Sequence, residues 1–149
     1  MAQRGGSVVA QIRYGENVFS PLTLEGSADA IFSLEMAEAV RCAHFLKPDG
    51  FAAVSRHRVI PVTVTTGSAV YPPDIEDRVK RVFPRLKLVD CMAWAAEAGD
   101  VRLANTMLVG VLSQVLNITE DSWLRAVEKN VKPAFLSSNI TAFKTGRKA

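Results

Sequence analysis

The residues near the start of the chain that could bind a ligand are Arg4, Gly5, Gly6 and Ser7, directly before an apolar segment. Glycines have no Cβ, so their backbone N–H groups can approach an anion closely, and the neighbouring arginine adds a planar fork of donors. The pattern indicates a loop for a phosphate or a carboxylate. A flexible tail with two glycines is the alternative, because a single Arg-Gly-Gly motif is weak evidence.

A second basic segment, Arg56, His57 and Arg58, follows an apolar stretch with the composition of a strand. Loops after strands are where α/β folds bind ligands, so this segment is a candidate for binding a phosphate or an acidic partner surface. A solvated surface loop explains the same charges. No serine or cysteine beside His57 marks a nucleophile, so the sequence gives little weight to a catalytic triad.

Asn105 lies in the most apolar segment of the chain, where a buried polar side chain needs hydrogen-bond partners. It could contact a ligand or a loop, or it could cross-link the core.

Cys42 and Cys91 have no nearby second cysteine and are interpreted as small core residues. With only His44 and His57 as histidines, the sequence predicts no metal site. The chain also has no dinucleotide, P-loop, zinc-protease or nucleophile-elbow motif.

Hydrophobic patterning predicts the elements that position these candidates. Apolar or alternating stretches predict strands over residues 7–13, 18–24, 28–34, 51–55 and 87–90. Apolar positions at helical spacing predict helices over residues 35–46, 74–86, 93–98, 101–116, 119–131 and 133–143. The segment 56–73 predicts an edge strand and a loop, because a proline and a glycine interrupt its valines.

Residues with capping or breaking character predict where several elements begin and end. Asp74 and Thr119 are predicted to cap the helices that follow them, Gly99 is predicted to end the helix over residues 93–98, and Gly146 is predicted to stop the last helix. The segment 47–50, Lys-Pro-Asp-Gly, is predicted to separate a helix from the next strand.

The order of these elements predicts an α/β domain over residues 1–149. Strand, helix and strand over residues 28–55 form a βαβ unit, which requires a parallel strand pair and a right-handed crossover. We therefore expect a mostly parallel sheet flanked by helices, with a helical C-terminal third. A Rossmann-like layered domain usually opens with a strand, a glycine-rich turn and a helix, and we expect this chain to lack that first βα unit.

Composition narrows the classes of protein. The chain has 149 residues, of which 48% are hydrophobic and 22% charged, and this fits one domain. A net charge of +3 is too small for the basic surface of a nucleic-acid-binding protein. The polar N-terminus has no leader pattern, and the longest weakly charged run is too short and too polar to span a bilayer. We expect a soluble cytoplasmic protein.

Several motifs occur in a specific joint order. They are Ala2-Gln3-Arg4-Gly5-Gly6-Ser7, Ser20-Pro21-Leu22, Leu34-Glu35-x-x-Glu38-Ala39, Leu46-Lys47-Pro48-x-Gly50, Tyr71-Pro72, Asn105-x-x-Leu108-x-Gly110 and Lys132-Pro133. In this order the chain resembles the gamma-type domain of 2-oxoacid:ferredoxin oxidoreductases, over essentially its whole length. The first motif is most similar to the beta subunit of the indolepyruvate branch.

The resemblance implies a subunit of a thiamine-diphosphate-dependent indolepyruvate or arylpyruvate:ferredoxin oxidoreductase. Such a complex decarboxylates a 2-oxoacid oxidatively to an acyl-coenzyme A and passes the electrons to ferredoxin. The resemblance implies that a larger partner subunit holds thiamine diphosphate, Mg²⁺ and the [4Fe–4S] clusters, so that this chain alone is inactive. Arg4, Gly5, Gly6, Ser7 and Asn105 are then candidates for the substrate or coenzyme A side.

Two other functions fit the residues. The chain could be a non-catalytic α/β interaction module that scaffolds a larger oxidoreductase subunit. It could also be a nucleotide-binding domain that acts alone, although the expected lack of a first glycine loop weighs against this.

Overall fold

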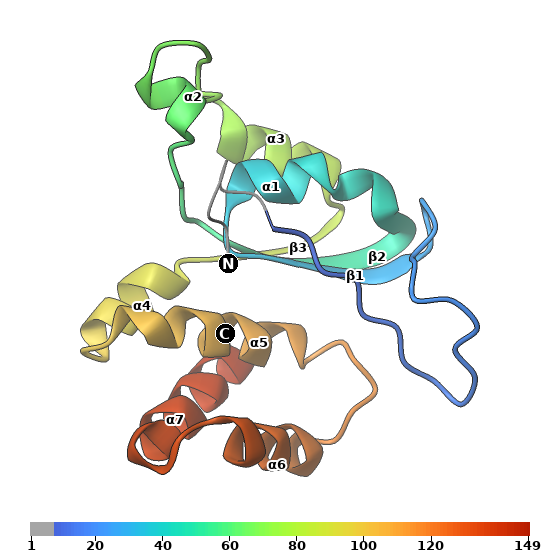
Figure 1. Cartoon of the computed structure of the whole chain (residues 1–149), viewed down its shortest axis with the longest axis vertical. Coiled ribbons are helices and arrows are strands. Elements are labelled where there is room, and N and C mark those ends of the chain that lie inside the picture. The colour runs from blue at the N-terminus through green and yellow to red at the C-terminus, as the bar shows by residue number, and fades with distance from the viewer. Residues whose placement is uncertain (1–7) are drawn as a thin grey trace.

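The computed structural model describes residues 8–149, so Arg4, Gly5, Gly6 and Ser7 lie outside the described part of the chain (Figure 1). The elements in chain order are β1 (Ala28–Ser33), α1 (Met36–Arg41), the short 3₁₀ helix η1 (Ala43–Phe45), β2 (Leu46–Ser55), α2 (Val62–Thr65), α3 (Ile75–Val82), β3 (Arg85–Val89), α4 (Cys91–Glu97), the short 3₁₀ helix η2 (Val101–Leu103), α5 (Ala104–Leu112), α6 (Glu120–Asn130) and α7 (Pro133–Lys148).

The described residues contain one parallel sheet with the order β1-β2-β3. Because parallel strands need a crossover, α1 connects β1 to β2, and α3 lies on the connection from β2 to β3. The predicted βαβ unit, the parallel sheet and the helical C-terminal third are therefore confirmed. The central strand β2 is buried on both faces, which explains its continuous apolar run, Ala52–Val54.

Helices cover both faces of the sheet (Figure 1). Ala52 and Val54 face a core shared with α1 and α3, whereas Ala53 faces a core shared with α4 and α5. Residues alternate between the two faces of a strand, so one short strand supplies both cores. Beyond α5, the helices α6 and α7 form a further layer (Figure 1). None of the helices in residues 8–149 combines the length and the apolar character needed to cross a membrane.

The helices α5 and α7 touch through their backbones at two glycines. A Cβ on Gly146 would lie 1.8 Å from the Met107 carbonyl oxygen, and a Cβ on Gly110 would lie 2.2 Å from the Phe143 carbonyl oxygen. The prediction that Gly146 stops the last helix is wrong, because α7 continues to Lys148. Glycine occurs there because a side chain would separate the two helices.

Several helix boundaries follow the predicted signals. The Thr119 hydroxyl accepts a hydrogen bond from the Ser122 N–H at 3.3 Å and caps α6. Gly99 has a φ of +85° just after α4, a left-handed conformation that glycine adopts without strain. Asp74 precedes α3 as predicted but makes no capping bond, because its carboxylate accepts from Arg78 Nε at 2.9 Å instead.

The structure corrects three predicted extended segments. Residues 8–13 and 18–24 form no strand, and most of them are exposed. The segment 56–73 contains the short helix α2 instead of an edge strand, because Pro61 ends the extended chain and leaves Val62 free to begin a helical turn. The segment 47–50 belongs to β2 but bulges out, since pairing with β1 passes from Leu46 to Phe51.

Candidate site at the carboxyl edge of the sheet

The carboxyl ends of the three parallel strands meet at one edge of the sheet. Ser33 pairs with Val54, and Ser55 pairs with Val89, so the chain leaves all three strands at nearly the same level. Open α/β sheets bind ligands beyond this edge. Ser55 is fully buried here, and its hydroxyl has no hydrogen-bond partner among the residues that the structure describes.

Glu35 follows β1 and is a buried acidic residue, with 8% of its surface exposed. One carboxylate oxygen caps α1 by accepting the Glu38 N–H at 2.7 Å. The other accepts the phenolic hydroxyl of Tyr71, which lies 36 residues further along the chain. A buried carboxylate needs such donors, since taking it out of water without them is costly. Glu35 therefore joins the start of α1 to the loop before α3.

Tyr71 is held in its protonated form. Burial raises the pKa of its hydroxyl, and the hydrogen bond to the Glu35 carboxylate raises it further. The Arg58 guanidinium carbon lies 6.0 Å from the centre of the Tyr71 ring, at the outer limit of a cation–π contact. At neutral pH, Tyr71 is thus a hydrogen-bond donor and not a general base.

The basic segment predicted from the sequence lies at this edge. The Arg56 N–H donates to the Val89 carbonyl at 2.7 Å, and the His57 carbonyl accepts the Met36 N–H at 3.3 Å. Arg56 Nη2 also lies 3.3 Å from Glu76 Oε1 of α3. These contacts fix the backbone after β2 and leave Arg56 and Arg58 exposed. The segment is placed where an anion could reach it, and anion binding stays a prediction.

Glu76 balances the basic segment from α3. Its carboxylate accepts from Lys80 Nζ at 2.9 Å in addition to the Arg56 contact. Lys80, followed by Arg56, lowers the pKa of Glu76 below its ordinary value. This carboxylate is therefore charged at neutral pH and neutralises part of the local positive charge. Arg58 forms no such ion pair within the described chain and is the guanidinium best placed to meet an external anion.

The third strand ends at two residues that serve the fold. Asp90 caps α4 by accepting the Ala93 N–H at 3.0 Å. Cys91 is fully buried, and burial raises the pKa of its thiol to about 12. Cys91 belongs to the buried core that also contains Ala53, so the interpretation of Cys91 as a core residue is confirmed. Cys42 is half-buried.

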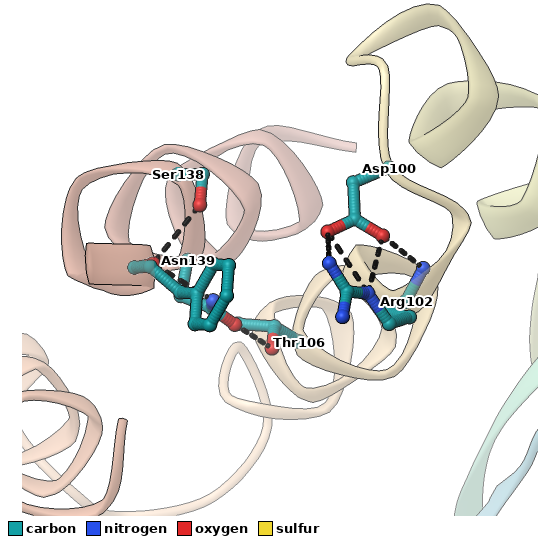
Figure 2. Close-up of polar contacts among 6 residues, drawn as sticks. Asp100, Arg102, Thr106, Ser138 and Asn139 are labelled. Carbon is teal, nitrogen blue, oxygen red and sulfur yellow. Dashed lines mark hydrogen bonds and ion pairs between the residues drawn. The ribbon is translucent and has the colours of Figure 1, made fainter. Parts of the chain in front are cut away.

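Asn105 is not in the core. The side chain is exposed on α5 (Ala104–Leu112), whose buried residues include Met107 and Leu108. The polar link between helices is made by the next residue, since Thr106 Oγ1 donates to Asn139 Oδ1 of α7 at 2.7 Å. Figure 2 shows these two side chains pointing toward one another. A contact of Asn105 with substrate or coenzyme A stays a prediction.

A second polar contact lies beside this link (Figure 2). Arg102 donates to the Asp100 carboxylate from Nε at 2.9 Å and from Nη2 at 2.8 Å, and it lowers the pKa of Asp100. The Arg102 guanidinium also lies over the Phe135 ring, 5.2 Å from its centre. Both groups are engaged within the chain, so this cluster joins η2 to α7.

The structure does not bring all predicted site residues together. The basic segment lies at the carboxyl edge, whereas Asn105 lies on α5 and Arg4, Gly5, Gly6 and Ser7 are outside the described residues. In residues 8–149, no group of three or more His, Cys, Asp or Glu side chains could hold a metal ion. Sequence reasoning missed the Glu35–Tyr71 pair. The one available signal was an acidic residue directly between an apolar strand and a helix.

Comparisons with known proteins cover the whole chain. Residues 1–149 match the family described as pyruvate ferredoxin/flavodoxin oxidoreductase. The chain is 34% identical to indolepyruvate oxidoreductase subunit IorB of Thermococcus kodakarensis, over 100% of this chain and 76% of that protein. It is 36% identical to the subunit of the same name from Archaeoglobus fulgidus, over 98% of this chain and 74% of that protein.

A solved structure shows the same fold. The gamma subunit of a keto/oxoacid ferredoxin oxidoreductase from Geobacter sulfurreducens superposes with a TM-score of 0.58 at 17% sequence identity. The superposition covers 80% of this chain, and the chain spans 62% of that subunit. At this identity the likeness concerns the arrangement of sheet and helices.

Proposed function

This chain belongs to the pyruvate ferredoxin/flavodoxin oxidoreductase family, and we propose from that premise that it is the beta-type subunit of an indolepyruvate oxidoreductase. One observation carries the proposal. The sequence matches proteins named as that subunit at 34% and 36% identity over at least 98% of its length. The matched region extends over the carboxyl edge of the sheet.

The reaction that we propose for the assembled enzyme is the oxidative decarboxylation of an arylpyruvate to an acyl-coenzyme A, with electrons passed to ferredoxin. A [4Fe–4S] cluster requires four thiolates, and this chain has two cysteines, one of them a buried thiol. Its residues do not fit a cluster. We therefore propose that the clusters lie in a larger partner subunit, to which the family resemblance also assigns thiamine diphosphate and Mg²⁺.

The contribution that we propose for this chain is binding and orientation at the carboxyl edge. Arg58 is exposed and lies over Tyr71, which Glu35 fixes in place. A guanidinium held in this way suits a carboxylate or a phosphate, which are the anionic groups of a 2-oxoacid and of coenzyme A. Arg4, Gly5, Gly6, Ser7 and Asn105 remain candidates for contact with the substrate or coenzyme A in the assembled enzyme.

Co-expression of an affinity-tagged form of this chain with the larger subunit tests the proposal. The tagged chain should retain the larger subunit in a fixed ratio, and the purified complex should reduce ferredoxin when an arylpyruvate and coenzyme A are added. A complex that never forms, or that turns over no arylpyruvate, would contradict the proposed function.

A non-catalytic scaffold is the second candidate, because the polar groups of Glu35, Tyr71 and Arg56 are already engaged inside the chain. The Arg58→Ala variant distinguishes the two functions. If the carboxyl edge contacts substrate or coenzyme A, this variant should assemble normally and show a KM for one of them raised about tenfold or more. Arg125→Ala, on the exposed face of α6, is the matched control. Equal kinetics for both variants would favour the scaffold.

A further inference from the structure

A hollow of about 270 Å³ lies at the amino edge of the sheet, a strand's length away from the carboxyl edge. Residues near the start of all three strands line it, together with the segment that follows α5. At this place β2 bulges, because its pairing with β1 passes from Leu46 to Phe51. Bulges re-aim side chains, and Lys47 and Asp49 of the bulge line the hollow.

Charged side chains of both signs surround the hollow. Lys47 Nζ lies 2.8 Å from Asp29 Oδ1 and 3.7 Å from Asp49 Oδ1. Arg85 Nη1 donates to the backbone carbonyl oxygen of Asp49 at 2.8 Å, which holds the guanidinium against the bulge. Within residues 8–149, Arg85 forms no ion pair, so its other N–H groups are open to an external acceptor. Two carboxylates thus balance two cations, and the net charge of the lining is zero.

An apolar surface adjoins these charges in the same hollow. Phe51 is half-buried and packs against the core that contains Ala53, and Val115 and Leu116 complete the apolar part of the lining. The carboxylate of Asp49 is 76% exposed, and its contact with Lys47 is long. The hollow therefore offers a guanidinium, an accessible carboxylate and an apolar surface to one small ligand.

We propose that this hollow binds a free α-amino acid with an apolar or aromatic side chain. The carboxylate of the ligand meets Arg85, its ammonium group meets Asp49, and its side chain lies on Phe51. A zwitterion brings one charge of each sign, so a neutral lining stays neutral when it binds. Pockets for drug-sized ligands enclose about 300–1,000 Å³, so a hollow of about 270 Å³ suits a smaller one. The site is independent of the proposed function, since it lies at the opposite edge of the sheet from Arg58.

A titration of the isotope-labelled full-length chain with L-phenylalanine, followed by backbone amide chemical shifts, tests this site. The amide signals of residues 47–51, 85–86 and 115–117 should shift together and saturate, with a Kd of about 1 mM or tighter. The amides of the basic segment 56–58 should not move. Shifts that never saturate, or that centre on residues 56–58, would overturn the proposal.

Two analogues separate recognition of a zwitterion from binding of a ring or of a single charge. Phenylpropanoate keeps the ring and the carboxylate but lacks the ammonium group, whereas phenylethylamine keeps the ring and the ammonium group but lacks the carboxylate. Each should bind about fivefold or more weakly than L-phenylalanine, because one charged contact is lost. Equal affinity for either analogue and for L-phenylalanine would show that the amino-acid assignment is wrong.

Two variants assign the charged contacts to their residues. Arg85→Gln should weaken L-phenylalanine binding about tenfold and leave phenylethylamine binding unchanged. Asp49→Asn should weaken L-phenylalanine binding and leave phenylpropanoate binding unchanged. Both side chains are exposed, so amide signals away from the hollow should match those of the wild-type chain.

Arg125→Gln, on the exposed face of α6, is the matched control and should bind L-phenylalanine like the wild-type chain. If Arg85→Gln binds L-phenylalanine as tightly as this control does, the guanidinium does not hold the ligand and the proposed site is overturned.

Discussion

Glu35 shows how one buried carboxylate organises the candidate site. It caps α1 and accepts the Tyr71 hydroxyl, so two segments that are 36 residues apart meet at one side chain. Tyr71 in turn lies beneath Arg58. The Glu35–Tyr71 hydrogen bond therefore lies next to the exposed guanidinium, and it can be removed by a single substitution.

Replacing Tyr71 by phenylalanine should destabilise the chain by about 1–3 kcal/mol, because the buried Glu35 carboxylate loses one of its donors. Urea unfolding followed by circular dichroism measures the change. Tyr14→Phe is the matched control, since Tyr14 is the other tyrosine of the chain and is 60% exposed. Equal stability of the two variants would show that the Glu35–Tyr71 bond contributes nothing.

Cys91 predicts how stability depends on alkaline pH. Its pKa is raised from 9.0 to about 12 in the folded chain, mainly by burial and then by Asp90. A raised folded-state pKa means that this contribution is complete below pH 9 and is lost as the pH rises toward 12. The unfolding free energy should therefore fall by up to about 1.4 kcal/mol per pH unit through this one thiol.

The Cys91→Ala variant isolates that contribution. Its unfolding free energy should decline less steeply between about pH 9 and about pH 11 than that of the wild-type chain. The comparison uses slopes, so a constant loss of packing at the substituted site does not affect it. Parallel curves for the two proteins would refute the assigned cause.

At the scale of elements, the sequence predicts the helices and strands whose signals lie in neighbouring residues. The apolar runs identify β1, β2 and β3, and Thr119 and Gly99 mark where α6 begins and where α4 ends. Such local signals fail where a contact between residues far apart in the sequence determines the structure. Residues 8–13 have the pattern of a strand, but a strand forms only beside another one. Gly146 has the type of a helix stop, but it serves the contact with Met107.

The contact between α5 and α7 gives an element-scale prediction. Gly146→Ala would place a Cβ 1.8 Å from the Met107 carbonyl oxygen, which forces the helices apart and should cost about 1–3 kcal/mol or more. Thr145→Ala, at the exposed neighbouring position, is the control and should change stability little. Thermal unfolding of both variants measures the difference. A Gly146→Ala protein as stable as the control would mean that the helices do not pack this closely.

At the candidate site, too, only the features that neighbouring residues determine could be predicted from the sequence. The position of Arg56 and Arg58 could be predicted, because a basic segment after a strand must lie at the carboxyl edge of a parallel sheet. The Glu35–Tyr71 pair could not, since no spacing relates two residues that only the fold brings together. The apolar neighbours of Asn105 leave a contact in the core and a contact with a ligand or loop equally open, and the structure shows the side chain exposed to solvent.

At the scale of the molecule, a layered α/β body carries an exposed basic segment, residues 56–58, at the carboxyl edge of its sheet. The sheet and its helices hold this segment in place, and the segment provides positive charge for an anion. A charged segment held at a fixed edge is what a subunit needs if it completes a shared site.

The most direct test of the central claim is a titration of the larger subunit with this chain, measured as the rate of ferredoxin reduction. With indolepyruvate and coenzyme A present, the rate should rise from background and saturate at a fixed ratio of the two chains. With pyruvate in place of indolepyruvate, the rate should stay well below that level. An indolepyruvate-dependent rate that is already maximal before any of this chain is added would contradict the account.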